Sequence, residues 1–146
     1  MYDKTITLFN RRHTREGDTW YPTVLHGVDL NADRAAVVAR YGSTSNDRAV
    51  LHVKYDWYDG PVIQGKPYQT PMVWAAAGDP ARVITFASGE LFDFFIEGEW
   101  PDAEPVSDAA YKTGFYDHLN RTRDGVYAVS SVSRFSVIPH FEITGR

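Results

Sequence analysis

The sequence predicts a mainly β protein, either a small antiparallel β-barrel or a sandwich, with one short helix. Several segments carry apolar and β-branched residues at near-alternate positions, which is typical of half-buried strands. Aromatic residues make up 14% of the 146 residues, and aromatic side chains favour strands. No internal repeat or linker divides the chain, so we expect one β domain over residues 1–146.

The first half of the chain begins with a predicted hairpin. A strand over residues 5–10 leads into a polar turn at 11–18, and a second strand returns over 19–30. Gly27 interrupts the returning strand and predicts a bulge or a sharp bend. Residues 31–47 are ambiguous, because the apolar run within them fits a helix or a strand.

A further strand is expected over residues 49–55, and a long excursion follows at 56–80. Proline cannot donate to a sheet ladder, so this excursion is expected to leave the sheet. Its prolines are Pro61, Pro67, Pro71 and Pro80, and its large aromatic residues are Trp57, Tyr58, Tyr68 and Trp74. A contiguous exposed apolar patch is rare on a monomer, so these four aromatic side chains either fold back on their own barrel or are covered by another chain. The length of the excursion favours contact with another chain.

The second half of the chain predicts strands at residues 82–86 and 91–97, followed by an acidic connector at 101–105. One helix is expected over about residues 108–121, capped by Ser107 and Asp108. Its apolar residues fall at helical spacing and are Tyr111, Phe115 and Leu119.

Two strands at the end of the chain tie the C-terminus into the sheet. The first opens after the Asp124-Gly125 turn and runs to about Val132, and the second runs from Phe135 through Val137 to Ile143. The predicted core residues lie on the apolar faces of the strands and are Ile6, Leu8, Val24, Leu51, Val53, Phe94, Val129 and Phe141.

Composition restricts the possible functions. The chain has no cysteine, so disulfides and thiolate chemistry are excluded. Its net charge of −4 argues against a protein that grips nucleic acid, and the basic run at residues 11–15 reads as a solvated hairpin tip. No segment has the length and hydropathy of a signal peptide or a membrane span, so we expect no membrane contact.

Motifs for catalysis or metal binding are sparse. Asp117 and His118 could meet His140 and Glu142 in space as a metal or acid–base site, but ordinary surface histidines explain these residues more simply. A set of acidic residues could suggest glycoside hydrolysis, but its alternation with apolar residues is more typical of the solvent-exposed face of a strand. That set is Glu90, Asp93, Glu97, Glu99, Asp102 and Glu104. We therefore expect no enzyme activity and no catalytic, cofactor or metal site.

Four segments read TITLFN, DTWYPTVLHGVDL, LFDFFIEGEW and DGVYAVSSVSRFSVIPHFEI. They resemble minor structural proteins encoded in the head–tail connector region of tailed phages and prophages of low-GC Gram-positive bacteria. The last segment is similar to the ending of head-closure (stopper) proteins of the phage neck. The length of 146 residues exceeds that of a minimal stopper, and the excess lies near residues 56–80 and 101–122.

The resemblance implies a small β-barrel that forms a homo-oligomeric ring below the portal and adaptor, seals the packaged DNA and receives the tail terminator or tail tube. It implies assembly in the host cytoplasm, location in the virion and passive proximity to DNA without sequence-specific binding. Trp57, Tyr58, Tyr68 and Trp74 are then the expected subunit-interface residues.

Two alternatives stay open. A tail-terminator ring protein fits the same virion setting, although such proteins need more helix than one segment. A carbohydrate-binding β-sandwich module would stack sugar rings on Trp57, Tyr58, Trp74 and Trp100.

Overall fold

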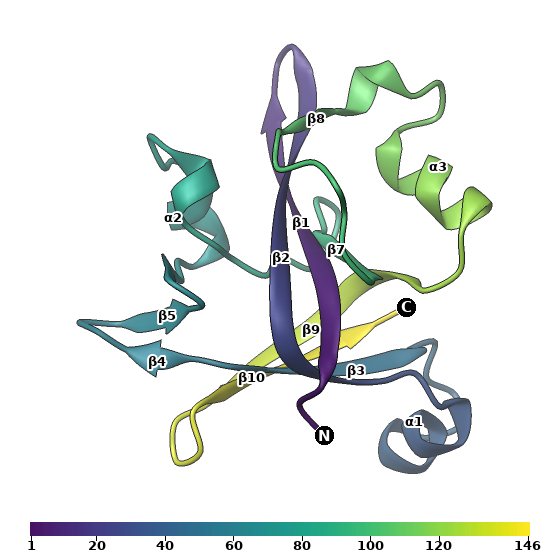
Figure 1. Cartoon of the computed structure of the whole chain (residues 1–146). Coiled ribbons are helices and arrows are strands. Elements are labelled where there is room, and N and C mark those ends of the chain that lie inside the picture. The colour runs from purple at the N-terminus through teal and green to yellow at the C-terminus, as the bar shows by residue number, and fades with distance from the viewer.

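A computed structural model describes residues 1–146 and shows a mainly β protein, as the sequence predicts (Figure 1). Seven strands form one large antiparallel sheet. They are β1 (Lys4–Thr14), β2 (Gly17–Asn31), β3 (Ala49–Lys54), β7 (Phe94–Glu97), β8 (Val106–Ser107), β9 (Val126–Phe135) and β10 (His140–Gly145).

The large sheet partly closes into a ring. Its strand order is β1-β7-β9-β10-β3-β2-β8, and β1 pairs with β2 as well. Strand β2 can serve both neighbours because it bends: the β1–β2 register shifts between Lys4 and Ile6, opposite Gly27. Gly27 has φ +61°, a conformation that side chains with a Cβ rarely adopt, and the predicted bulge is confirmed.

The last hairpin differs from the prediction. The second terminal strand does not begin at Phe135, because β9 runs to that residue and a four-residue turn follows at 136–139. Pro139 closes the turn, and proline cannot donate to a ladder. Val137 therefore lies at the hairpin tip rather than on the face of a strand.

Two clusters of buried side chains form the core. The larger one lies within the partly closed sheet and includes Ile6, Leu8, Leu51, Val53, Val129 and Phe141. Phe94 is buried in the second cluster, with Phe9, Trp20, Phe115 and Leu119. Seven of the eight predicted core residues are buried, whereas Val24 is only half-buried and Leu25 takes the inward position beside the bulge.

The structure contains three helices: α1 (Arg34–Tyr41), α2 (Pro71–Ala75) and α3 (Phe115–Thr122). Helix α1 resolves the ambiguous segment, with Asp33 accepting from the backbone of Ala35 and Ala36. The helix predicted over 108–121 was wrong in extent. A 3₁₀ turn covers Asp108–Ala110. Gly114 has φ +94°, which is incompatible with an α-helix, so α3 begins only at Phe115.

The excursion at 56–80 does leave the large sheet, as predicted. It forms a small three-stranded sheet of β4 (Asp56–Trp57), β5 (Pro61–Ile63) and β6 (Lys66–Pro67), followed by α2. The strand predicted at 82–86 is absent, since only Ile84 makes an isolated bridge, to Tyr68. Here the turn at Pro80–Arg82 replaces a regular ladder. None of the helices is both long and apolar enough to cross a bilayer.

Candidate functional site

The tip of the β9–β10 hairpin exposes apolar side chains with nothing from the same chain above them. Val137 is 95% exposed and Ile138 is 72% exposed, and Phe135 at the end of β9 is partly exposed as well. The tip projects from the body of the molecule (Figure 1). Isolated exposed apolar residues are ordinary, but adjacent ones at the end of a projection form a patch that can bind a partner.

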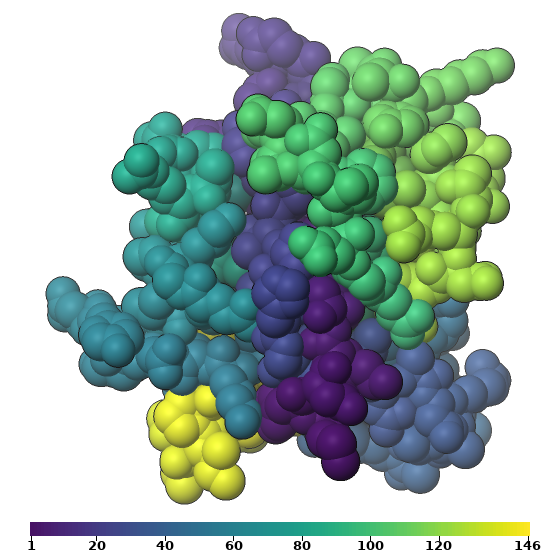
Figure 2. All heavy atoms as spheres, in the orientation of Figure 1, coloured from purple at the N-terminus to yellow at the C-terminus, as the bar shows by residue number.

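A second projection lies beside this tip. Trp57 ends β4 and Tyr58 lies in the turn between β4 and β5, and these side chains are 64% and 75% exposed. The Arg134 guanidinium on β9 lies 6.0 Å from the Trp57 ring centroid and connects the two projections. Figure 2 shows them next to each other on one side of the molecule. We call this patch the apolar arm surface, and it consists of Trp57, Tyr58, Phe135, Val137 and Ile138.

Two of the four aromatic residues predicted to meet a partner do not lie on this surface. Trp74 is 2% exposed, donates through its indole nitrogen to the Val83 carbonyl and packs edge-on against Tyr21. Tyr68 packs against the core beside Phe141. The expectation that all four rings need another chain was therefore wrong for these two, because the excursion folds back over the large sheet.

Sequence reasoning missed the hairpin tip. Phe135, Val137 and Ile138 were assigned to a strand that buries alternate residues, although Pro139 was a signal that the ladder is interrupted there. A turn placed before Pro139 would have put the two aliphatic residues at its apex.

The aromatic platform expected of a carbohydrate-binding module does not form. Trp74 is buried, and Trp100 packs edge-on against Phe9 and Phe115 in the second core cluster. Only Trp57 and Tyr58 of the proposed stacking residues stay open to solvent.

A separate cleft of about 350 Å³ lies between the β1–β2 hairpin and α2. Arg11, His13 and Asp93 line it together with Met72 and Leu91. Asp93 does not lie on a wet strand face, as had been expected, because it is only 1% exposed. Its carboxylate accepts from Asn10 Nδ2 at 2.9 Å and from the backbone nitrogens of Arg11 and Ala87, each at 2.8 Å.

Burial raises the pKa of Asp93 to about 7, against the lowering effect of its three nitrogen donors. Those donors come from β1 and from the loop before β7, so the carboxyl group joins segments far apart in the sequence. Because its oxygens already accept from these donors, we assign Asp93 to the scaffold of the hairpin and not to reaction chemistry.

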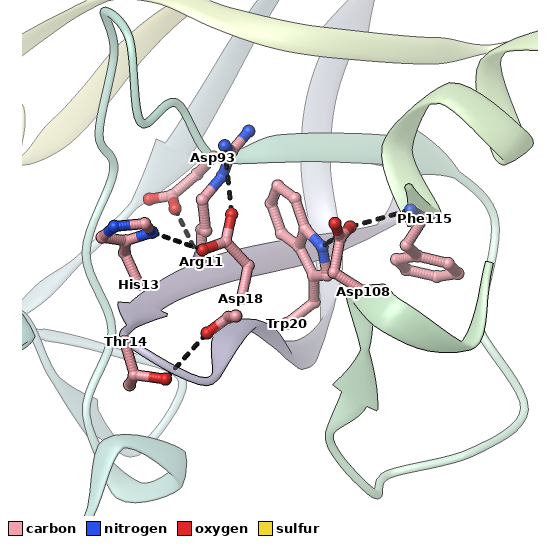
Figure 3. Close-up of polar contacts among 9 residues, drawn as sticks. Arg11, His13, Thr14, Asp18, Trp20, Asp93, Asp108 and Phe115 are labelled. Atoms are coloured by element: carbon pink, nitrogen blue, oxygen red, sulfur yellow. Dashed lines mark hydrogen bonds and ion pairs between the residues drawn. The ribbon is translucent and has the colours of Figure 1, made fainter. Parts of the chain in front are cut away.

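The polar residues beside the cleft support the same hairpin (Figure 3). The Arg11 guanidinium lies 4.4 Å from the Trp20 ring centroid and 3.4 Å from an Asp18 carboxylate oxygen. Asp108 accepts from the Trp20 indole nitrogen at 2.9 Å and from the Phe115 backbone nitrogen at 2.8 Å. Asp108 therefore links β2 to the start of α3.

The structure does not bring together the four residues that the sequence suggested as a metal or acid–base site, Asp117, His118, His140 and Glu142. His118 on α3 packs against Tyr111, and Asp117 pairs with Arg121 on the same helix. His140 and Glu142 instead lie with His52 of β3, a partner that has no sequence signal because it comes from a different strand. Burial and a hydrogen bond to Glu142 raise the pKa of Tyr41 to about 12, so Tyr41 stays protonated and donates to this cluster.

Comparison with known proteins gives one result. No curated protein and no solved structure shows a significant match to this chain. A family of unknown function, DUF6751, matches residues 1–146, so the chain belongs to the DUF6751 family.

Proposed function

We propose that this protein is a structural virion protein of a tailed phage, a head-closure or neck ring subunit that joins the portal and adaptor to the tail. The observation that carries the proposal is the apolar arm surface, where two adjacent projections expose aromatic and aliphatic side chains. A ring requires a head-to-tail contact between copies, in which a patch on one subunit meets a different patch on the next.

The proposed occupant of the apolar arm surface is a neighbouring copy of this chain. Trp and Tyr are enriched among the residues that dominate binding energy at interfaces, and Trp57 and Tyr58 are the most exposed rings on the two projections. The β9–β10 projection is part of the sheet that partly closes into a ring, and the β4–β5 projection directly follows β3 of that sheet. Such a scaffold holds them in fixed positions, which lowers the entropy lost on assembly.

The charge of the chain supports a role near packaged DNA without tight binding. A net charge of −4 gives no overall attraction to phosphates, so DNA can pass without being gripped. The remaining partners in the proposal are the portal or adaptor on one side and the tail terminator or tail tube on the other. The protein acts without a reaction or a cofactor, assembles in the host cytoplasm and stays in the virion.

One observation favours the tail-terminator ring as a second candidate within the virion. Such a protein needs more helix than the single segment that the sequence predicts, and the structure contains three helices. All three are short, with eight residues in α1, five in α2 and eight in α3, so head closure stays the first choice.

The proposal is tested in a phage or prophage whose genome encodes this chain. Purified particles should contain the protein in constant ratio to the portal by quantitative mass spectrometry. Deletion of its gene should give filled heads that lack tails and lose DNA, as seen by electron microscopy. Tails of normal length with an irregular end would identify the terminator instead. Absence of the chain from particles, with normal tailed particles after deletion, would contradict both virion roles.

A further inference from the structure

We propose that His52, His140 and Glu142 form a binding site for a divalent transition-metal ion, with Zn²⁺ as the best fit. One nitrogen from each imidazole and one carboxylate oxygen lie within 4.8 Å of one another. Two imidazoles and one carboxylate are the protein ligands of zinc sites that keep a fourth position open. This site is independent of the proposed virion role, and it departs from the sequence-based expectation of no metal.

The backbone register of the sheet fixes the three positions. Glu142 of β10 lies directly opposite His52 of β3 in the antiparallel ladder. His140 precedes Glu142 by two residues on β10, and residues two apart on a strand share a face. The three side chains therefore start from one face of two paired strands, where a site is held more precisely than on a loop.

The outer hydrogen bonds orient both imidazoles for metal binding. His140 Nδ1 lies 2.6 Å from the Ile138 carbonyl oxygen. A carbonyl only accepts, so Nδ1 carries the proton and Nε2 keeps its lone pair. His52 Nδ1 lies 3.3 Å from Asp29 Oδ2. In metal sites a ligating histidine almost always donates its other N–H to a carboxylate or backbone carbonyl, and both histidines have such a partner.

The second nitrogen of His52 faces Glu142. His52 Nε2 lies 3.6 Å from Glu142 Oε2. If Nδ1 of His52 donates to Asp29, a lone pair on Nε2 meets a carboxylate oxygen, and a cation between the two removes the repulsion. Ligand atoms around tetrahedral zinc with bonds of about 2.0–2.2 Å are roughly 3.3–3.6 Å apart, which fits this separation.

Two residues of α1 complete the surroundings of Glu142. Tyr41 donates to Oε1, which leaves Oε2 for the metal and holds the carboxylate in place. Arg40 Nη2 lies 2.7 Å from the same Oε2 and would compete with a bound cation. The Arg40 side chain is 51% exposed, so it can turn into water when the metal binds. Replacing Arg40 with Met should therefore tighten metal binding.

The test uses the full-length protein, freed of metal with a chelator and titrated with Zn²⁺ alone in a calorimeter. We expect one ion per chain. Removing a residue that hydrogen-bonds to a metal ligand typically weakens metal affinity about 10- to 100-fold, and the loss caused by Asp29→Asn should fall within that range. His52→Ala and His140→Ala should each weaken zinc binding by more than this. His26→Ala is the matched control, since His26 is an exposed histidine that contacts Thr5 and is not one of the three clustered residues, and it should leave the affinity unchanged.

A second metal gives a spectroscopic readout of the ligand geometry. Co²⁺ bound at the same site should show visible d–d absorption that disappears on adding Zn²⁺ and is absent from the His52→Ala/His140→Ala variant. If circular dichroism shows that a histidine variant is unfolded, Glu142→Gln replaces it, because the amide keeps the shape and an acceptor for Tyr41. The absence of saturable binding, or equal binding by the double histidine variant, would overturn the site and leave these residues as an ion-pair network only.

Discussion

The two long hairpins of this molecule end in opposite ways. At the tip of β1–β2, Asp18 accepts from His13 Nδ1 at 2.6 Å and Thr14 donates to the Gly17 carbonyl, so the polar groups are satisfied within the chain (Figure 3). At the tip of β9–β10, Val137 and Ile138 face solvent.

The difference predicts which tip would gain free energy by binding another molecule. A tip whose donors and acceptors are paired internally gains little from a partner, because binding would exchange one set of hydrogen bonds for another. An apolar tip gains free energy in proportion to the apolar area that a partner removes from water, about 25 cal/mol per Å². We therefore propose that the tip of the first hairpin contributes to the stability of the fold and that the tip of the second serves association.

The largest effect on stability is expected on the buried face of the apolar hairpin. Phe141 lies in β10, is buried in the larger core cluster and packs against Tyr55, Tyr68 and Phe86. Phe141→Ala should lower the free energy of unfolding by about 3–5 kcal/mol, because it leaves a cavity. Urea denaturation measures this loss. Val137→Ala on the same hairpin is the control, and an equal loss there would show that the buried face and the exposed tip do not differ in their contribution to stability.

The next effect is expected at Asp93, which holds the polar hairpin at Asn10 and Arg11. In Asp93→Asn the side chain keeps one oxygen acceptor, but its amide NH₂ group replaces the other oxygen and faces an N–H donor that loses its acceptor. The substitution should therefore lower the free energy of unfolding by about 1–3 kcal/mol. Urea denaturation at fixed pH measures the difference from wild type.

The same residue gives a pH dependence. The pKa of Asp93 is about 7 in the folded protein and 3.8 ordinarily, so the folded state holds a proton that the unfolded state releases. The stability from Asp93 is therefore complete below about pH 4 and is lost as the pH rises through about 7. Between pH 5 and pH 8, wild type should therefore lose stability relative to Asp93→Asn. A gain of wild type relative to Asp93→Asn over this range would mean that the three donors hold the ionised form.

A smaller effect is expected at the tip of the polar hairpin. Asp18→Ala removes the acceptor of both His13 and Arg11 and should cost about 1–2 kcal/mol in the free energy of unfolding. Thermal unfolding at pH 7 detects the change, while assembly should stay as in wild type. Loss of assembly in a folded Asp18→Ala variant would remove the contrast between the two tips.

The sequence predicted much of the fold because its signals were local. Alternating residues located the first hairpin and its bend at Gly27, and they correctly placed Ile6, Leu8 and Phe141 in the core. The extent of α3 was overestimated because Tyr111, Phe115 and Leu119 have helical spacing, although Gly114 interrupts the helical conformation. Spacing alone does not show a backbone break with positive φ.

The candidate sites were harder to predict, because they depend on which segments meet in space. Trp57 and Trp74 look alike in sequence, yet Trp57 is exposed, whereas Trp74 is the buried residue of α2 and packs against Tyr21. His52 joins His140 and Glu142 only through the pairing of β3 with β10. Long-range strand pairing of this kind leaves no motif in the sequence.

The most direct test of the account replaces the apolar arm surface while leaving the core intact. In a variant with Trp57→Ser, Val137→Ser and Ile138→Ser, the free energy of unfolding should stay within about 0.5 kcal/mol of the wild-type value, since these side chains are exposed. Met72→Ser is the matched control, because Met72 is equally exposed but lies on α2.

The measurement is incorporation of each variant into purified phage particles that lack the wild-type protein, counted with the yield of tailed, infectious particles. We predict that the triple variant is folded but absent from particles, and that Met72→Ser is incorporated as wild type. Normal incorporation and infectivity of the triple variant would contradict the assignment of this surface to assembly.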